Sequence, residues 1–266
     1  MLIDFHVHAF ADSIAEKAVK LLSETSQTKP ETNGTLMDTK KKLKDFKIDK
    51  AVILPIATKP SQQTVINNWA YENQDDFFCF FGSIHPDSEN VFDELKRIKN
   101  LGLHGIKLHP DYQDFMIDED KMIPIYKKCV ELDLPVLFHA GLDPFSPNII
   151  HAPPELILKA FNKVPEMTMI LGHLGGMSMW DEVEKYLVGK KGNIFFDISV
   201  VSNYININQA KRIIKNHGSE RILFGSDCPW DNPINEKNMI ENMNLSQNDM
   251  DLIFYKNAEK ILLFRH

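Results

Sequence analysis

The stretch Leu2-Ile3-Asp4-Phe5-His6-Val7-His8 at the start of the chain decides how the rest of the sequence is interpreted. Its apolar residues favour a β-strand, and the strand would end in two histidines. Residues two apart in a strand point to the same side. His6 and His8 would therefore direct both imidazoles toward one point, the arrangement needed to bind one metal ion. A strand end that only happens to carry two histidines is the alternative.

Short apolar runs alternate with helical patterns along the 266 residues. The predicted strands are residues 2–8, 50–54, 77–82, 104–108, 135–139, 167–173, 194–198 and 221–224. Almost entirely apolar strands are buried on both faces, as in a parallel sheet. The pattern predicts an α/β fold of the (β/α)8 TIM-barrel type. A doubly wound sheet is the alternative, but it usually has a Gly-rich turn after strand one, and this chain has His-Val-His at that place.

Helical patterns fill the segments between these strands. We predict helices at residues 12–22, 36–46, 62–73, 90–100, 118–132, 154–161, 177–187, 208–216, 235–243 and 247–264, the last with a break near Asn257. No composition shift marks a linker. We therefore predict a single barrel domain over residues 1–266 with a C-terminal helical extension.

Composition and charge exclude several classes of function. The net charge is −7 with both signs interspersed, so the lysine-rich run at residues 40–44 is expected to be a solvated helix face and not a nucleic-acid site. The three cysteines are widely spaced, which argues against a disulfide scaffold and suits a reducing cytoplasm. No secretory signal pattern and no apolar run of ~18 residues is present, so we expect a cytoplasmic protein without a membrane role.

Metal-binding types of side chain recur where the predicted strands end. In a TIM barrel these ends converge on one mouth. They carry His6 and His8 (strand one), Lys107 (four), His139 (five), His173 (six) and Asp227 (eight). A single histidine near a strand end is more often structural, but such residues at five strand ends are hard to assign to chance. Imidazole and carboxylate together suit zinc or another divalent first-row metal.

Several short motifs place the chain near a known family. They are Gly-Ile-Lys-Leu-His-Pro at 105–110, Phe-His-Ala-Gly at 138–141, Gly-His-Leu-Gly-Gly at 172–176, Phe-Gly-Ser-Asp-Cys-Pro at 224–229 and Asn-Ala-Glu-Lys-Ile-Leu at 257–262. Together with His-Val-His, they resemble the amidohydrolase superfamily and, more closely, its amidohydrolase-2 family. That family includes aminocarboxymuconate-semialdehyde decarboxylase and related hydrolases. The resemblance runs almost from end to end, and its motifs are specific only in combination.

The resemblance implies a role for each matching position. His6, His8 and His139 would be metal ligands. Asp227 would bind the metal and accept the proton of the reacting water. His173 would act as acid or base, or hold the water, in relatives with one ion, and would bind the second ion in relatives with two. The expected cofactor is one or two divalent ions, with Zn²⁺ as the first choice.

Lys107 leaves two interpretations open. In two-metal amidohydrolases a lysine at the end of strand four is carboxylated by CO2 and bridges the ions. A free ammonium has no lone pair and cannot bind a metal, whereas the carbamate can. Alternatively, a charged Lys107 would pair with a substrate carboxylate or with Asp227.

Residues just beyond the strand ends are candidates for substrate binding. We select His109, His151 and Trp180, with Phe145 nearby. Trp180 has a competing explanation, because it begins an amphipathic helix and could simply pack. No surface feature identifies a protein partner, although a homodimer is compatible with a barrel of this kind.

The predicted function is a metal-dependent hydrolase acting on an amide, lactam, lactone or ester of a small molecule, because a bound metal supplies activated water. The alternative is a metal-dependent, non-oxidative decarboxylase. Arginine is the preferred bidentate partner of carboxylates. None of the four arginines follows a predicted strand, which favours the hydrolase. A third reading, a non-catalytic metal-binding protein, does not explain so complete a ligand set.

Overall fold

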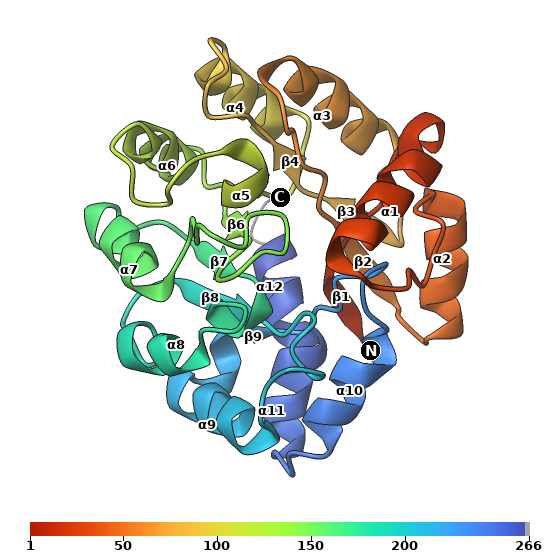
Figure 1. Ribbon diagram of the computed structural model, residues 1–266, viewed down its shortest axis with the longest axis vertical. Coiled ribbons are helices and arrows are strands. Elements are labelled where there is room, and N and C mark those ends of the chain that lie inside the picture. The colour runs from red at the N-terminus through yellow and green to blue at the C-terminus, as the bar shows by residue number, and fades with distance from the viewer. Residues whose placement is uncertain (264–266) are drawn as a thin grey trace.

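The computed structural model describes residues 1–263, and its strands pair in parallel (Figure 1). They are β1 (Ile3–Val7), β2 (Lys50–Ile53), β3 (Phe78–Phe80), β4 (Gly82–Ser83), β5 (Ile106–Leu108), β6 (Val136–Phe138), β7 (Met169–Leu171), β8 (Ile194–Asp197) and β9 (Ile222–Leu223). Each predicted strand is present but shorter than expected. The residues at the ends of the predicted strands belong to loops in the structure, and these loops carry most of the polar side chains of the candidate site.

One predicted strand, residues 77–82, is divided into β3 and β4 at Phe81. The first half pairs with β2, and the second half pairs with β5. The amide of Phe81 still donates to the carbonyl of Ile53 at 3.1 Å, while that of Gly82 donates to Gly105 at 2.8 Å. The strand therefore turns from one sheet into the next, and backbone hydrogen bonds continue across the turn.

The last strand meets the first at a second seam. Two sheets are present, β1-β2-β3 and β4-β5-β6-β7-β8-β9, instead of one continuous ladder. The amide of Phe5 donates to the carbonyl of Phe224 at 2.8 Å, and the amide of Asp227 donates to the carbonyl of His6 at 2.7 Å. These bonds join the two ends of the strand order. The prediction of an α/β TIM barrel is confirmed.

Helices surround the strands, most of them in an outer layer, while the last one lies near the centre of the view in Figure 1. They are α1 (Asp12–Ser26), α2 (Leu36–Asp45), α3 (Gln63–Glu72), α4 (Val91–Asn100), α5 (Pro110–Gln113), α6 (Met122–Glu131), α7 (Pro154–Lys163), α8 (Trp180–Tyr186), α9 (Ile207–His217), α10 (Pro233–Glu241), α11 (Gln247–Asp251) and α12 (Asn257–Leu263). The short helix α5 was not predicted, because four residues are too few to show a helical period. A π-helical turn, Leu252–Lys256, separates α11 from α12, so the predicted helix 247–264 is interrupted just before Asn257. Its last residue, Phe264, lies outside the described residues.

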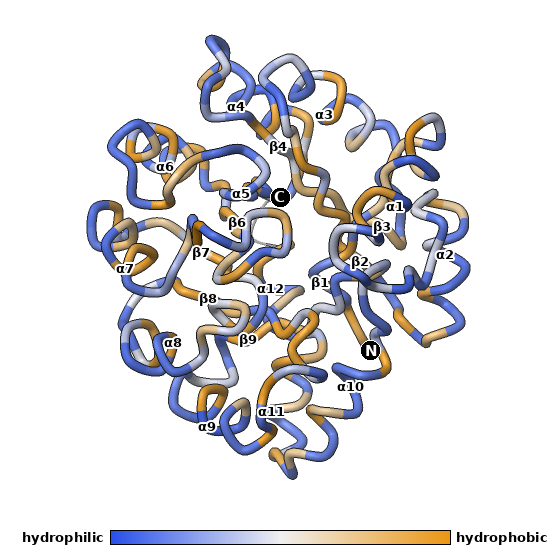
Figure 2. The backbone as a smooth tube through the Cα atoms, in the orientation of Figure 1, coloured by the Kyte–Doolittle hydropathy of each residue, from blue (hydrophilic) through white to orange (hydrophobic). Residues whose placement is uncertain are grey.

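Apolar side chains fill the barrel and the space between strands and helices. Figure 2 shows hydrophobic colour along the strands and mixed colour along the outer helices. The inner cluster combines strand residues with three residues of α12, as follows: Ile3, Phe5, Val52, Leu54, Phe81, Leu137, Ile170, Phe195, Leu223, Ala258, Ile261 and Leu262. The helix α12 therefore packs against the barrel interior, and the C-terminal extension contributes to the core.

No helix in residues 1–263 combines the length and the apolar character needed to cross a lipid bilayer.

Candidate metal centre

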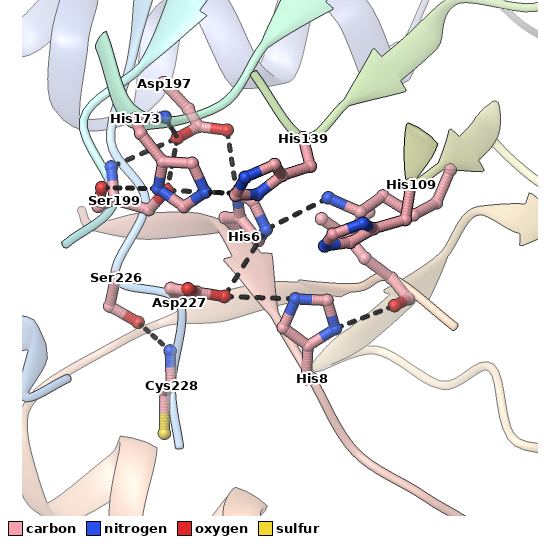
Figure 3. A network of polar contacts seen from close by, with 12 residues as sticks. His6, His8, His109, His139, His173, Asp197, Ser199, Ser226, Asp227 and Cys228 are labelled. Atoms are coloured by element: carbon pink, nitrogen blue, oxygen red, sulfur yellow. Dashed lines mark hydrogen bonds and ion pairs between the residues drawn. The ribbon is translucent and has the colours of Figure 1, made fainter. Parts of the chain in front are cut away.

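His6, His8 and Asp227 form a compact group at the mouth of the barrel (Figure 3). The Asp227 Oδ1 atom lies 3.0 Å from His8 Nε2 and 3.5 Å from His6 Nε2. The three ligand atoms all lie within 4.8 Å of one another. Two imidazole nitrogens and one carboxylate oxygen at this spacing form a donor set that fits a divalent first-row metal.

The other nitrogen of each imidazole is already engaged. His6 Nδ1 lies 2.8 Å from Asp197 Oδ2, and His8 Nδ1 lies 2.9 Å from the carbonyl oxygen of Leu54. A carbonyl oxygen only accepts, so His8 Nδ1 must carry the proton. Its Nε2 lone pair then faces Asp227. Carboxylate and carbonyl partners of this kind orient metal-binding histidines and make them better ligands.

The electrostatics keep His6 ready to bind a cation. Burial, followed by the positive charge of Lys107, lowers the pKa of His6 from 6.5 to about 4, so its ring is neutral at pH 7. Burial by itself would raise the pKa of the Asp197 carboxyl. The positive charge that His6 and His173 carry when protonated, with the hydrogen bonds from His6 and Ser199, outweighs it, and the pKa falls below the usual range. The pair is therefore a neutral imidazole donating its Nδ1 proton to a carboxylate.

His139 and His173 form a second group beside the first. His173 Nδ1 lies 2.9 Å from the carbonyl oxygen of Ser199, and His139 Nε2 lies 3.3 Å from that of Leu142. Both of these nitrogens must donate, since a carbonyl oxygen cannot. The remaining atoms, His173 Nε2 and His139 Nδ1, are 3.0 Å apart. Two lone pairs that face each other at this distance need a cation between them, either a proton or a metal ion.

Lys107 lies between these two groups. Its side chain is only 1% exposed, and its Nζ atom is 3.2 Å from His6 Nε2. Burial lowers the pKa of Lys107 to about 8, although nearby Asp227, Asp197 and Asp143 act in the opposite direction. Roughly a tenth of this amine is consequently uncharged at pH 7.

The three predicted substrate residues have different surroundings. The His109 ring stacks on that of His139, with centroids 4.4 Å apart. His151 Nδ1 is 2.9 Å from Asp111 Oδ1, and the Trp180 indole donates to the carbonyl of His173 at 3.1 Å. The structure thus brings His109 next to the candidate ligands. It engages His151 and Trp180 in contacts within the protein, and their role with substrate stays a prediction.

His109, His139 and Asp143 also lie close enough to suggest a metal group. Asp143 Oδ2 is 3.6 Å from the Nε2 atoms of both histidines. However, the two rings are stacked only 12° from parallel, so their in-plane lone pairs run side by side and do not converge. The His139 Nε2 atom also contacts the Leu142 carbonyl. In this arrangement Asp143 is better suited to an electrostatic interaction with the N–H groups of the two rings than to sharing a metal with them.

A family model described as amidohydrolase matches residues 3–264. The chain belongs to the amidohydrolase-2 family. Its family membership agrees with the resemblance seen in the motifs around Lys107, His139, His173 and Asp227. No curated protein sequence matches this amidohydrolase significantly.

Solved structures with the same fold are distant in sequence. A dihydroxybenzoic acid decarboxylase from Polaromonas, with bound manganese, has 16% identity and a TM-score of 0.74, covering 100% of this chain and 97% of that one. A probable 2-pyrone-4,6-dicarboxylic acid hydrolase from Acinetobacter baumannii has 17% identity and a TM-score of 0.67, with 99% coverage of both chains. An uncharacterised TIM-barrel protein from Bordetella bronchiseptica has 15% identity and a TM-score of 0.78, again with 99% coverage of both. At these identities the likeness establishes the fold of this amidohydrolase.

Sequence reasoning missed several residues that support the site of this amidohydrolase. Asp197 is the last residue of β8, so its strand-end position was a usable signal. Ser199 lies two residues further, and its Oγ donates to Asp197 at 2.6 Å. Asp143 follows His139 by four residues. The Leu54 carbonyl is part of the backbone, and no side-chain pattern could have pointed to it.

Proposed function

We propose that this amidohydrolase is a metal-dependent hydrolase acting on an amide, lactam, lactone or ester of a small molecule. The observation that carries the proposal is the group His6, His8 and Asp227, in which each imidazole has its Nδ1 atom engaged and its Nε2 atom facing the carboxylate. A divalent ion held there would make hydroxide available near pH 7 and would polarise the substrate carbonyl. Zn²⁺ is our first choice, and Mn²⁺ is the alternative suggested by the manganese of the Polaromonas enzyme.

The residues around this ion have separable tasks in the proposal. Asp227 Oδ1 is directed at the two imidazoles, which leaves Oδ2 to accept a proton from the attacking water and pass it to the leaving group. His6 is held in position by Asp197, and His8 by the Leu54 carbonyl. The stacked rings of Tyr112, His109 and His139 would form one wall of the site in the proposal.

We further propose that His139 and His173 bind a second ion. Their facing nitrogens are 3.0 Å apart, and both would offer a lone pair to an ion bound beside them. Carboxylated Lys107 would supply an anionic oxygen between the two ions. A proton shared between His139 and His173, with Lys107 left as an amine that contacts the substrate, is the one-ion alternative.

A decarboxylase is the second candidate function. It is favoured by the names of several structural neighbours, including the dihydroxybenzoic acid and 5-carboxyvanillate decarboxylases. Against it, the arginines in residues 1–263 have partners elsewhere. Arg97 pairs with Glu94, Arg212 pairs with Glu184, and Arg221 donates to backbone carbonyls. A substrate carboxylate would then have to be bound by Lys107 or by the metal. The fourth arginine, Arg265, lies outside the described residues.

A substrate screen distinguishes the two reactions. The protein, loaded in turn with Zn²⁺ and Mn²⁺, is incubated with small amides, lactones, esters and aromatic carboxylic acids, and CO2 release is scored separately from hydrolysis. We expect hydrolysis without CO2 release, and CO2 release alone would replace the proposal with the decarboxylase. The matched control is the His6→Ala/His8→Ala double variant. It should keep the circular dichroism spectrum but lose bound metal by elemental analysis, and unchanged metal content would disprove the site.

A further inference from the structure

Asp4 is a buried carboxylate close to the candidate metal centre that the proposed reaction does not use. It lies in β1 two residues before His6 and is inaccessible to solvent. Its Oδ1 atom accepts the amide of Ser226 at 3.0 Å and the amide of His6 at 3.2 Å. Its Oδ2 atom accepts the hydroxyl of Ser226 at 2.5 Å. Oδ1 therefore contacts both chain segments that carry candidate metal ligands, and Oδ2 contacts the second of them.

The Ser226 hydroxyl connects Asp4 to the backbone on the far side of Asp227, at Cys228. Its Oγ atom, besides donating to Asp4, accepts the amide of Cys228 at 3.0 Å. One hydroxyl thus joins the residues on both sides of Asp227, and Figure 3 shows the contact between Ser226 and Cys228 beside the Asp227 carboxylate. The amide of Asp227 itself donates to the carbonyl of His6 at 2.7 Å.

The backbone of Asp227 needs such support. Its φ angle is +65°, in the left-handed region. A residue with a side chain pays roughly 1–2 kcal/mol for this conformation, although aspartate tolerates it better than most. The conformation turns the Asp227 carboxylate toward His8, and the neighbouring hydrogen bonds must hold it there.

We infer that Asp4 is a positioning residue that fixes the Asp227 carboxylate relative to His6 and His8 through the hydroxyl of Ser226. The inference rests on the proposed metal centre, and it assigns Asp4 no contact with substrate or metal. Without this link the segment 226–228 is free to relax from its left-handed turn, and Asp227 Oδ1 loses its 3.0 Å approach to His8 Nε2. Hydrogen-bond partners of metal ligands commonly change metal affinity by 10–100-fold.

Two variants test the link by metal affinity. Asp4→Asn retains the volume and one acceptor oxygen, but it takes the acceptor away from the Ser226 hydroxyl. Ser226→Ala removes the bonds that the hydroxyl makes to Asp4 and Cys228, while the Ser226 amide can still donate to Asp4. The dissociation constant for Zn²⁺ alone is measured by competition with a chromophoric chelator, and the melting temperature of the metal-free protein is measured in parallel. We expect metal binding at least 10-fold weaker in both variants, with kcat reduced at saturating metal.

The control is Thr39→Val, which removes a buried hydroxyl on α2 that bonds to Thr32 at 3.3 Å. It should lower the melting temperature without changing Zn²⁺ affinity. If Asp4→Asn and Ser226→Ala behave like this control, the pair only stabilises the fold and the inference is overturned. Failure of Asp4→Asn to fold leads to the same conclusion, and if only Ser226→Ala fails to fold, Asp4→Asn decides. Wild-type protein that binds no Zn²⁺ or Mn²⁺ would instead refute the proposed function.

Discussion

At the candidate site, backbone carbonyls that can only accept hydrogen bonds determine which ring nitrogen of a histidine carries a proton. The carbonyls of Leu54, Ser199 and Leu142 each accept a hydrogen bond from one ring nitrogen of a histidine. In a neutral imidazole the opposite nitrogen then carries the lone pair, which can bind a proton or a metal ion. Binding sites for cations are thus built from backbone oxygens outside the site as much as from the ligands inside it.

Lys107 gives the sharpest prediction for a single residue. We expect two ions per wild-type chain and one ion in Lys107→Met, because a neutral thioether cannot form the carbamate that would hold the second ion. Elemental analysis of protein reconstituted in bicarbonate counts the ions. A protein with one ion in both forms would contradict the two-ion proposal and leave Lys107 as an amine facing the substrate.

The sequence pointed to the candidate ligands more readily than to the residues that hold them in position. His6 and His8 could be identified because the two-residue period of a strand directs both side chains to one side. Asp227 could be identified because it follows a predicted strand. Asp197 was missed even though it also ends a strand, since its contact with His6 joins residues 191 apart in the chain. That contact depends on how the barrel closes, which a local pattern does not contain.

Secondary-structure elements were predicted by type more reliably than by boundary. The helix predicted at 118–132 begins only at Met122, because a turn and the short helix α5 occupy the connection after β5. Strand 77–82 was predicted whole, but the chain turns at Phe81 to pair with β5. The apolar pattern specifies burial, and it does not specify which neighbour a strand pairs with.

The C-terminal end of α9 carries a testable titration. His217 is 1% exposed, its Nε2 donates to the carbonyl of Ile194 at 2.9 Å, and its ring stacks on Phe196. Burial lowers the pKa of His217 from 6.5 to about 4. As the pH falls from 6.5 to 4, His217 binds a proton in the unfolded chain but stays neutral in the folded chain. The free energy of unfolding should therefore decrease by up to about 3 kcal/mol on acidification from pH 6.5 to pH 4.

The His217→Gln variant isolates this effect. Glutamine can still donate to the Ile194 carbonyl but does not titrate. We expect the variant to be less stable at pH 7, through the lost stack, yet to show a shallower dependence on pH between 6.5 and 4. Urea unfolding of both metal-free proteins at several pH values gives the comparison, and parallel slopes would show that His217 is not the group responsible.

At the scale of the whole molecule, the candidate centre exists because the barrel is closed by contacts between its first and last strands. His6 comes from β1, Asp227 from the loop after β9, and the two meet at the seam where Phe5 donates to Phe224. A ligand set of this kind connects the N-terminal strand to the C-terminal part of the fold. An ion bound there should consequently stabilise the complete chain, and its removal should weaken the closure.

Metal removal tests this coupling. A ligand at 100 times its dissociation constant adds about 2.7 kcal/mol to the free energy of unfolding. For a chain of this size, that corresponds to a rise of roughly 5–10 °C in melting temperature. Calorimetry of the protein with excess chelator, and then with Zn²⁺ or Mn²⁺, measures the shift. The His6→Ala/His8→Ala variant should show a smaller shift, because it lacks the ligands from β1 and keeps only the residues proposed for the second ion. An equal shift in that variant would place the stabilising ion elsewhere, while no shift in the wild type would mean that the closed barrel does not gain stability from a metal.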